Sequence, residues 1–154
     1  MRADLTSFTG RPRRKYAFAV SVFRIRTGQK IERHDITEHV IAAVKALPVS
    51  DGAVLISVPH TTAAITIGEN YDPDVTTDME RALAAWVPGV RFDHSEGNSA
   101  AHFLSEAIGT SRLIPLAGGK PKLGQWQGIF FIELDGPRER IVEVTVVGQV
   151  TGDR

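Results

Sequence analysis

The spacing of apolar residues divides the chain into short strands and three helices. Residues 16–25 alternate β-branched, aromatic and small side chains, which predicts a strand buried on both faces. Further strands are predicted at about 53–58, 61–67, 111–116, 126–134 and 141–150. Helical spacing and capping residues predict three helices: about Ile36 to Leu47, Asp72-Pro73 to Pro88-Gly89, and about Ala100 to Ile108, the last capped by Ser99.

This mixed order of helices and strands, ending in hairpins, predicts an α+β fold. The chain has 154 residues, of which 42% are hydrophobic and 23% charged, values ordinary for a globular protein. A chain of this size forms one core, and no internal repeat or linker divides it. We therefore expect a single domain over residues 1–154.

Charge and composition remove several classes of function. The 18 basic and 18 acidic residues give a formal net charge of +0, so nucleic acid is not an expected partner. The basic run at 11–15 is interpreted as a solvated arm, and contact with a phosphate is the alternative. The absence of cysteine excludes thiolate ligands and cysteine nucleophiles. No apolar run approaches the roughly 20 residues of a membrane span and no signal peptide is recognised, so we expect a cytoplasmic protein with no membrane partner.

His60 stands where a predicted apolar strand ends. Pro59 precedes it and Thr61 and Thr62 follow, so an imidazole and two hydroxyls lie at a change of backbone direction. Such a histidine can be structural, a metal ligand, an acid or base, or a phosphate contact. The residue types alone leave these roles open.

A second histidine pair surrounds a turn that leads into the third predicted helix. His94 and His102 flank Glu96, Gly97 and Asn98, and the positive N-terminal end of a helix favours a bound anion. Three neutral imidazoles would suit zinc, whereas imidazoles beside an amide and hydroxyls would suit a phosphate or diphosphate. Both interpretations stay open, and the remaining histidines, in charged surroundings, are interpreted as surface residues.

The C-terminal third has fewer candidates. Trp126 is interpreted as a core or interface residue in preference to a stacking platform. The simplest interpretation of Glu133, Asp135, Arg138 and Arg140 is a charged hairpin turn, from which Arg138 could reach a phosphate. The sequence has no P-loop, dinucleotide-binding glycine pattern or Gly-x-Ser-x-Gly elbow.

The ordered set of these motifs resembles the YjbQ-like (secondary thiamine-phosphate synthase) family from about Asp35 to Gly148. The segments that carry the resemblance are 59–67, 72–75, 94–98, 101–102, 123–128 and 135–138. The resemblance implies a mixed, mostly antiparallel sheet curved into a half-barrel with about three helices, assembled as a homotrimer. It also implies a transferase that joins a hydroxymethylpyrimidine diphosphate to a thiazole phosphate and releases diphosphate.

Site residues follow from the matching positions. The expected catalytic residues are His60, His94, Glu96, Asn98 and His102, and the expected substrate-binding residues are Thr61, Thr62, Trp126, Gln127 and Arg138. His60, His94 and His102 are the alternative ligands of a divalent ion, Zn or Mg. The chain departs from the family pattern at Gly68 (usually Asn), Ala100 (usually Asp) and Gln125 (commonly Thr), and the loss of a carboxylate at Ala100 bears on any metal or acid/base role there.

Two classes of function therefore compete. The first is an enzyme that acts on a small phosphorylated substrate at a histidine-rich site. The second is a non-catalytic trimer that binds an anion or a metal ion, and a third, simpler interpretation makes the histidines structural.

Overall fold

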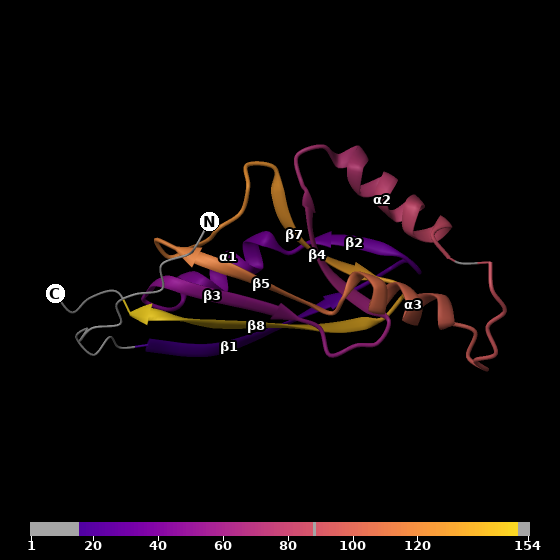
Figure 1. Cartoon of the computed structure of the whole chain (residues 1–154), viewed down its shortest axis with the longest axis horizontal. Coiled ribbons are helices and arrows are strands. Elements are labelled where there is room, and N and C mark those ends of the chain that lie inside the picture. The colour runs from indigo at the N-terminus through magenta and orange to yellow at the C-terminus, as the bar shows by residue number, and fades with distance from the viewer. Residues whose placement is uncertain (1–15, 88, 151–154) are drawn as a thin grey trace, which may run out of the picture.

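The structure, a computed structural model, describes residues 16–87 and 89–150 as two antiparallel sheets and three helices (Figure 1). Sheet A has the order β1 (Tyr16–Arg26), β8 (Glu139–Val150), β3 (Val49–Ser57), β5 (Ser111–Ala117) and β6 (Lys120–Pro121). Sheet B has the order β2 (Glu32–Asp35), β7 (Gln127–Glu133) and β4 (Ala63–Glu69). The helices are α1 (Thr37–Lys45), α2 (Pro73–Ala85) and α3 (Ser99–Ile108). The basic run at 11–15 and the helix-ending Pro88 lie outside the described residues.

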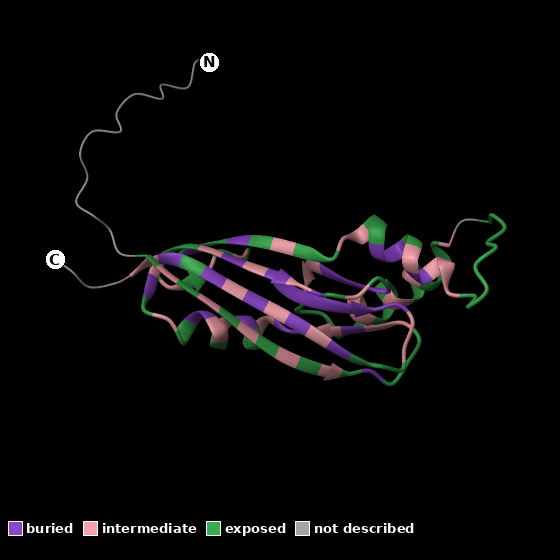
Figure 2. Cartoon of the chain, turned by 90° about the horizontal axis from the view of Figure 1, so that it is seen from below, coloured by how far each residue is buried: buried purple, intermediate pink, exposed green. Residues whose placement is uncertain are grey.

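Strand β1 is less buried than the sequence predicts. It pairs with β8 along its whole length and forms the edge of sheet A, and its positions alternate between exposed and half-buried (Figure 2). Phe18 is 69% exposed and Val22 is 58% exposed, so the prediction of a strand buried on both faces is wrong within the described chain. An apolar run shows that side chains can be buried, but it does not show what covers them.

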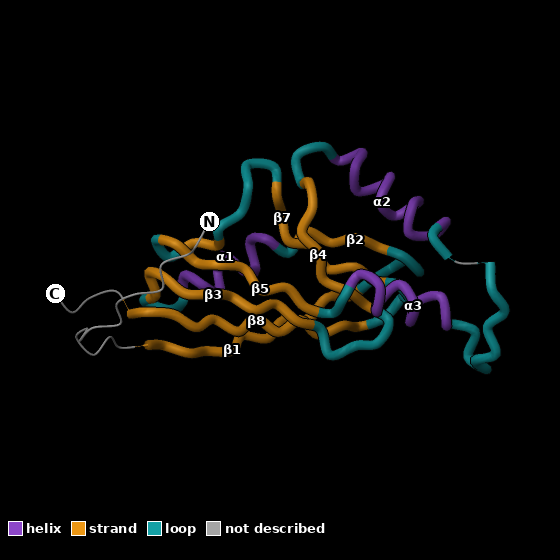
Figure 3. The backbone as a smooth tube through the Cα atoms, in the orientation of Figure 1, coloured by secondary structure: helices purple, strands orange, loops and turns teal. Residues whose placement is uncertain are grey.

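Sheet B lies between two apolar layers. Its central strand β7 is buried on both faces from Gly128 to Glu133. Ile129 and Phe131 point into the core shared with sheet A, whereas Phe130 and Ile132 pack toward α3 and α2. The tube view shows α2 and α3 at one end of the molecule, over sheet B (Figure 3). The molecule is therefore layered as sheet A, sheet B and the helices α2 and α3, whereas α1 contributes to the core between the sheets.

The larger core lies between the sheets and receives two apolar residues of α1. Its fully buried members include Val40, Val44, Val54, Ile56, Ile65, Ile129, Phe131, Val142, Val144 and Val146. The smaller core lies on the helix side of sheet B and contains Ala64, Ala101, Leu104, Phe130, Ile132 and Leu134. Burial of these side chains provides the main favourable free energy for the layered arrangement.

The observed helix ends lie within a residue or two of the ends predicted from the sequence. Asp72 caps α2, because its carboxylate accepts the main-chain N–H of Asp74 at 2.9 Å, as predicted. The predicted Ser99 cap of α3 is wrong: Ser99 is the first helical residue, Asn98 occupies the cap position, and no side-chain cap bond forms there. Gly109 ends α3 with φ at +100°, a conformation that suits glycine.

Two strands were not predicted. Strand β2 is a four-residue segment, Glu-Arg-His-Asp, with no apolar alternation, and β6 has two residues. Both exist because longer neighbours pair with them. The predicted α+β class, with three helices and a mainly antiparallel half-barrel, is confirmed. No helix in the described ranges is both long and apolar enough to cross a membrane.

Candidate functional site

A polar cavity lies where three connections meet at one end of sheet B. They are the β3–β4 loop, the segment that enters α3, and the β7–β8 turn. The cavity has a volume of about 320 Å³ and is lined by Pro59, His60, Thr61, Thr62, Glu96, Asn98, His102, Asp135, Arg138 and Arg140. Residues as far apart in the sequence as Pro59 and Arg140 thus share one open hollow.

His60 is held by the main chain of β8. Its Nε2 accepts the N–H of Ile141 at 2.8 Å, just past the last residue pair of β3 and β8, Ser57 with Glu143. A neutral imidazole whose Nε2 is an acceptor carries its proton on Nδ1. Burial lowers the pKa of His60 below its ordinary value of 6.5, and the charge of Arg140 acts in the same direction. His60 is therefore a neutral hydrogen-bond donor through Nδ1.

At the wall of the cavity, Arg140 forms a buried ion pair with Glu133. The Arg140 Nε and Nη2 donate to the two carboxylate oxygens of Glu133 at 2.8 and 2.6 Å, and Arg140 is 5% exposed and Glu133 fully buried. Arg140 Nη2 also donates to the hydroxyl of Thr62 at 2.8 Å. Burial opposes ionisation of Glu133, but hydrogen bonds from Arg140 and from the Asp135 N–H hold its pKa below the ordinary value. The pair joins β7 to β8, and the bond from Arg140 to Thr62 fixes the β3–β4 loop to β8.

Asp135 connects the β7–β8 turn to the start of α3. Its carboxylate accepts the Asn98 side-chain N–H at 3.0 Å and Arg138 Nη2 at 2.7 Å, and its carbonyl accepts Arg138 Nε at 2.8 Å. Burial alone would raise the pKa of Asp135, but the bonds from Asn98 and Arg138 lower it overall. Thr27 supports the same turn, because its hydroxyl accepts the Arg138 N–H at 2.8 Å. Arg138 is thus directed over the cavity and remains half-exposed.

The other two candidate histidines, His94 and His102, lie on the α3 side. His102 lines the cavity from the first turn of α3, and the His94 ring packs edge-on against it with 5.7 Å between ring centroids. His94 Nε2 lies 3.8 Å from a carboxylate oxygen of Glu96, which also lines the cavity. Ala100 lies instead in a separate small hollow beside Lys30, so the departure at this position falls outside the cavity wall.

The geometry does not place three metal ligands together. Within residues 16–87 and 89–150, no group of three or more His, Asp or Glu side chains is arranged to hold a metal ion. The Nε2 of His60 is already engaged by Ile141. The metal site of His60, His94 and His102 stays a prediction to which this geometry adds no support.

The structure separates the candidate residues into two places. All the expected residues except His94, Trp126 and Gln127 line the cavity, and His94 contacts it through His102. Trp126 and Gln127 lie at the opposite end of β7, where Trp126 packs edge-on against Tyr71 and Gln127 accepts the Gly124 N–H. Within one chain these two residues do not line the cavity around His60.

The sequence interpretation of a charged hairpin missed the buried pair. Glu133 and Arg140 are interior residues, which corrects that interpretation for two of its four charges. A signal was present: period-two spacing places Arg140 on the same strand face as the buried Val142, Val144 and Val146. A charged residue at a buried strand position requires a partner.

The fold and the cavity together define an α+β half-barrel protein with a polar, histidine- and arginine-lined cavity at one end of the smaller sheet. The family model described as "UPF0047 protein YjbQ-like" matches residues 21–149. The chain belongs to this family. A UPF0047 protein of Methanocaldococcus jannaschii is 47% identical over 127 residues, covering 82% of this chain and 92% of that protein. The UPF0047 protein YugU of Bacillus subtilis is 43% identical over 131 residues, covering 84% and 99%.

Solved structures give the same result. A YjbQ/UPF0047 family protein from Clostridium acetobutylicum is 44% identical with a TM-score of 0.76, over 84% of this chain and 99% of that chain. A YbjQ-like protein from Sulfolobus solfataricus has a TM-score of 0.81 at 30% identity, over 87% and 99%. These similarities extend over nearly the whole described fold.

Proposed function

We propose that the cavity around His60 binds the phosphate or diphosphate group of a small molecule, and that the protein is an enzyme of the thiamine-phosphate synthase type. The observation that carries the proposal is the convergence of His60, His102, Thr61 and Arg138 on one open cavity. A phosphate group takes hydrogen bonds from neutral N–H and O–H donors and from guanidinium groups. The cavity wall offers each of these donor types.

The electrostatics support an anion held mainly by directed donors. The charges of Arg138 and Arg140 are balanced by Asp135 and Glu133, and Glu96 also lines the wall, so the wall has no excess of positive charge. His60 supplies Nδ1–H from a fixed neutral ring, and the cavity lies at the positive N-terminal end of α3.

The proposed reaction requires help mainly for its leaving group. The bond between the pyrimidine methylene carbon and the diphosphate oxygen breaks, and that carbon bonds to the thiazole nitrogen. The electron pair leaves with the diphosphate, so hydrogen bonds that strengthen as this charge develops lower the barrier. In this proposal His60 and Arg138 contact the departing oxygens, and His102 is the acid that can protonate them.

The experiment measures thiamine phosphate formation and diphosphate release from the two substrates by purified protein. His102→Asn should reduce turnover by about 10²-fold or more, which is typical for loss of an acid. His39→Gln is the matched control, because His39 is exposed and stacks on Phe23 far along the chain from the cavity residues. Equal turnover in wild type and His102→Asn, or none in either, contradicts the synthase assignment.

Binding of inorganic diphosphate, measured by calorimetry, distinguishes the second class of function. A protein that binds diphosphate through Arg138 but turns over neither substrate is a non-catalytic anion-binding protein. Zinc titration of the wild type and of His102→Asn tests the metal prediction separately. A metal ion that binds the wild type and is lost in His102→Asn supports ligation by His102.

We also propose that the protein acts as a homotrimer in which the outer face of sheet A is the subunit interface. This outer face is apolar across four strands, in rows read from the strand registers: Phe18, Val147, Ala53 and Pro115, then Val20, Thr145, Leu55 and Leu113. Exposed apolar surfaces of this extent mark association sites. Arginines on β1 and glutamates on β8 place both signs of charge at its rim, so a second copy is complementary to it.

A further inference from the structure

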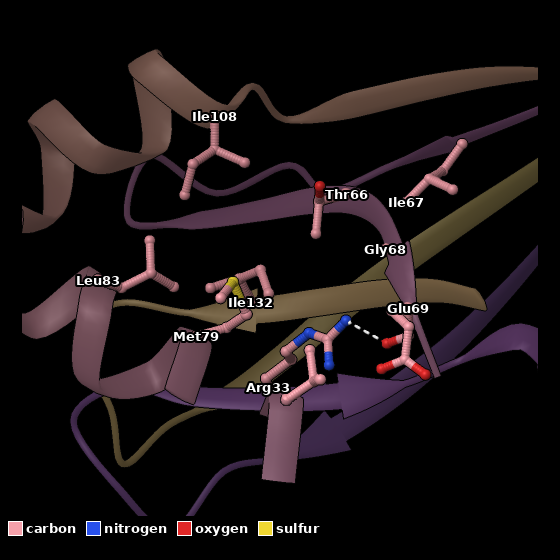
Figure 4. Close-up of a pocket in the computed structure, with 10 residues that line it drawn as sticks. Arg33, Thr66, Ile67, Gly68, Glu69, Met79, Leu83, Ile108 and Ile132 are labelled. Carbon is pink, nitrogen blue, oxygen red and sulfur yellow. Dashed lines mark hydrogen bonds between the residues drawn. The ribbon is translucent and has the colours of Figure 1, made fainter. Parts of the chain in front are cut away.

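A second cavity, of about 320 Å³, lies between α2 and the helix-facing side of sheet B (Figure 4). Its walls are mainly apolar, with Val75, Met79 and Leu83 from α2, Ile132 from β7, Ile108 from α3 and Ile67 from β4. It shares none of its lining residues with the cavity around His60. Its volume falls in the range of small-molecule sites.

Helix α2 does not pack directly on sheet B at this cavity, which lies between them. Val75, Met79 and Leu83 recur every four residues on one helix face, yet none of the described α2 residues is fully buried. A stripe of this kind normally packs directly on a sheet, because protein interiors contain few voids larger than a water molecule. The helix therefore presents its apolar face to a space that a ligand can fill.

The polar end of the cavity is Arg33. This residue is 8% exposed, and its guanidinium lies over the Phe130 ring, 3.2 Å from the ring centroid. Nη1 donates to the Thr76 hydroxyl at 2.7 Å and Nη2 to the Glu69 carbonyl at 3.0 Å. A guanidinium has five N–H donors, so these two bonds leave capacity for an acceptor from a ligand.

The surroundings of Arg33 select a neutral acceptor over an anion. Burial lowers the pKa of Arg33, while the negative charges of Asp35, Glu69 and Glu80 act in the opposite direction. With three carboxylates around one guanidinium, this end of the cavity has no excess positive charge. A second anion would meet repulsion, whereas a carbonyl or ring nitrogen would not.

Gly68 keeps the cavity open beside Arg33. A Cβ at this position would lie 2.9 Å from Arg33 Nη2, so any side chain here would compete with the guanidinium for space. Gly68 also lines the cavity.

We propose that this cavity binds a neutral, mainly apolar small molecule with one hydrogen-bond acceptor directed at Arg33. An apolar cavity of 150 Å³ accommodates benzene, so about ten to fifteen non-hydrogen atoms fit here. The proposal does not rest on the function proposed for the cavity around His60. The two sites take chemically different ligands.

Three matched probes test the site: benzamide, toluene and benzoate, titrated separately into the full chain and followed by methyl NMR. Benzamide should shift the methyl signals of Met79, Leu83, Ile108 and Ile132 saturably. It should bind about tenfold more tightly than toluene, which lacks the acceptor, because a hydrogen bond to a charged group contributes at least this much. Benzoate should bind more weakly than benzamide.

Variants locate the binding. Met79→Trp should fill the cavity and abolish the benzamide shifts, and Gly68→Asn, which approaches from the sheet, should do the same if the first variant does not fold. Thr77→Trp, on the exposed face of α2, is the control and should leave binding unchanged. The proposal is overturned if no probe causes saturable shifts, if benzoate binds as tightly as benzamide, if toluene equals benzamide, or if folded filling variants still bind.

Discussion

The Nε2 of His60 accepts the main-chain N–H of Ile141 at 2.8 Å. Two segments separated by most of the chain are joined by this bond, which fixes both the orientation of the ring and its tautomer. The residue that the sequence singles out first thus has one nitrogen committed to the fold and one available to the cavity.

The first prediction concerns protonation of His60. Its pKa lies below 6.5, so the unfolded chain binds a proton more readily than the folded protein as the pH falls below that value. The contribution of His60 to stability should therefore be complete above about pH 6.5 and decrease at lower pH. A ¹⁵N NMR titration should show Nε2 as the unprotonated nitrogen at neutral pH. Titration at or above 6.5 would contradict this prediction.

The second prediction concerns the buried ion pair. Glu133→Leu or Arg140→Met should each lower the free energy of unfolding by about 3–5 kcal/mol, because either change leaves a buried polar partner without its counterpart. Urea denaturation measures this loss. The double variant Glu133→Leu with Arg140→Met should recover part of it, and a double variant as unstable as the sum of the single ones would contradict a direct pair.

The third prediction is the acid sensitivity that the same pair causes. The pKa of Glu133 is held below its ordinary value of 4.5, so its stabilising contribution is present above 4.5 and is lost as the pH falls through the lower, folded-state pKa. Unfolding measured between neutral and strongly acidic pH should show a steeper acid limb in the wild type than in Glu133→Gln. Identical slopes would show that Glu133 ionises alike in both states.

The fourth prediction concerns the β7–β8 turn that carries Arg138. A Cβ at Gly136 would lie 2.2 Å from the carbonyl oxygen of Gln29, a backbone atom that cannot move aside cheaply. Gly136→Ala should therefore destabilise the fold by about 1–3 kcal/mol or more. Gly28→Ala is the control, because nothing lies within 4 Å of a Cβ there. Thermal unfolding of both variants provides the comparison.

The fifth prediction tests the proposed subunit interface. Val20→Glu and Leu113→Glu place a charge on the outer face of sheet A, where each residue is more than half exposed in the single chain. Light scattering should show a trimer for the wild type and monomers for these variants, because burying an unpaired charge is costly. Thr77→Glu on α2 should remain trimeric. A monomeric wild type would exclude the proposed trimer.

Much of the architecture follows from local patterns. Period-two and helical spacings predict the long strands and all three helices, because burial on one face leaves a repeat in the sequence. Asp72 marks the start of α2 in the sequence, because the cap bond that its carboxylate accepts comes from Asp74, only two residues away. Short strands such as β2 carry no such repeat and depend on the partners that pair with them.

The sequence by itself determined the class of fold, the family resemblance and the segments in which His60, His94 and His102 lie. Only the tertiary structure decided which of these residues share a cavity, that Arg140 in its wall pairs with the buried Glu133, and that Trp126 lies at the far end of β7. The physical reason is that ion pairs, cavities and strand registers join residues far apart in the chain. Local spacing records which face of an element is buried, but it does not record the partner that covers it.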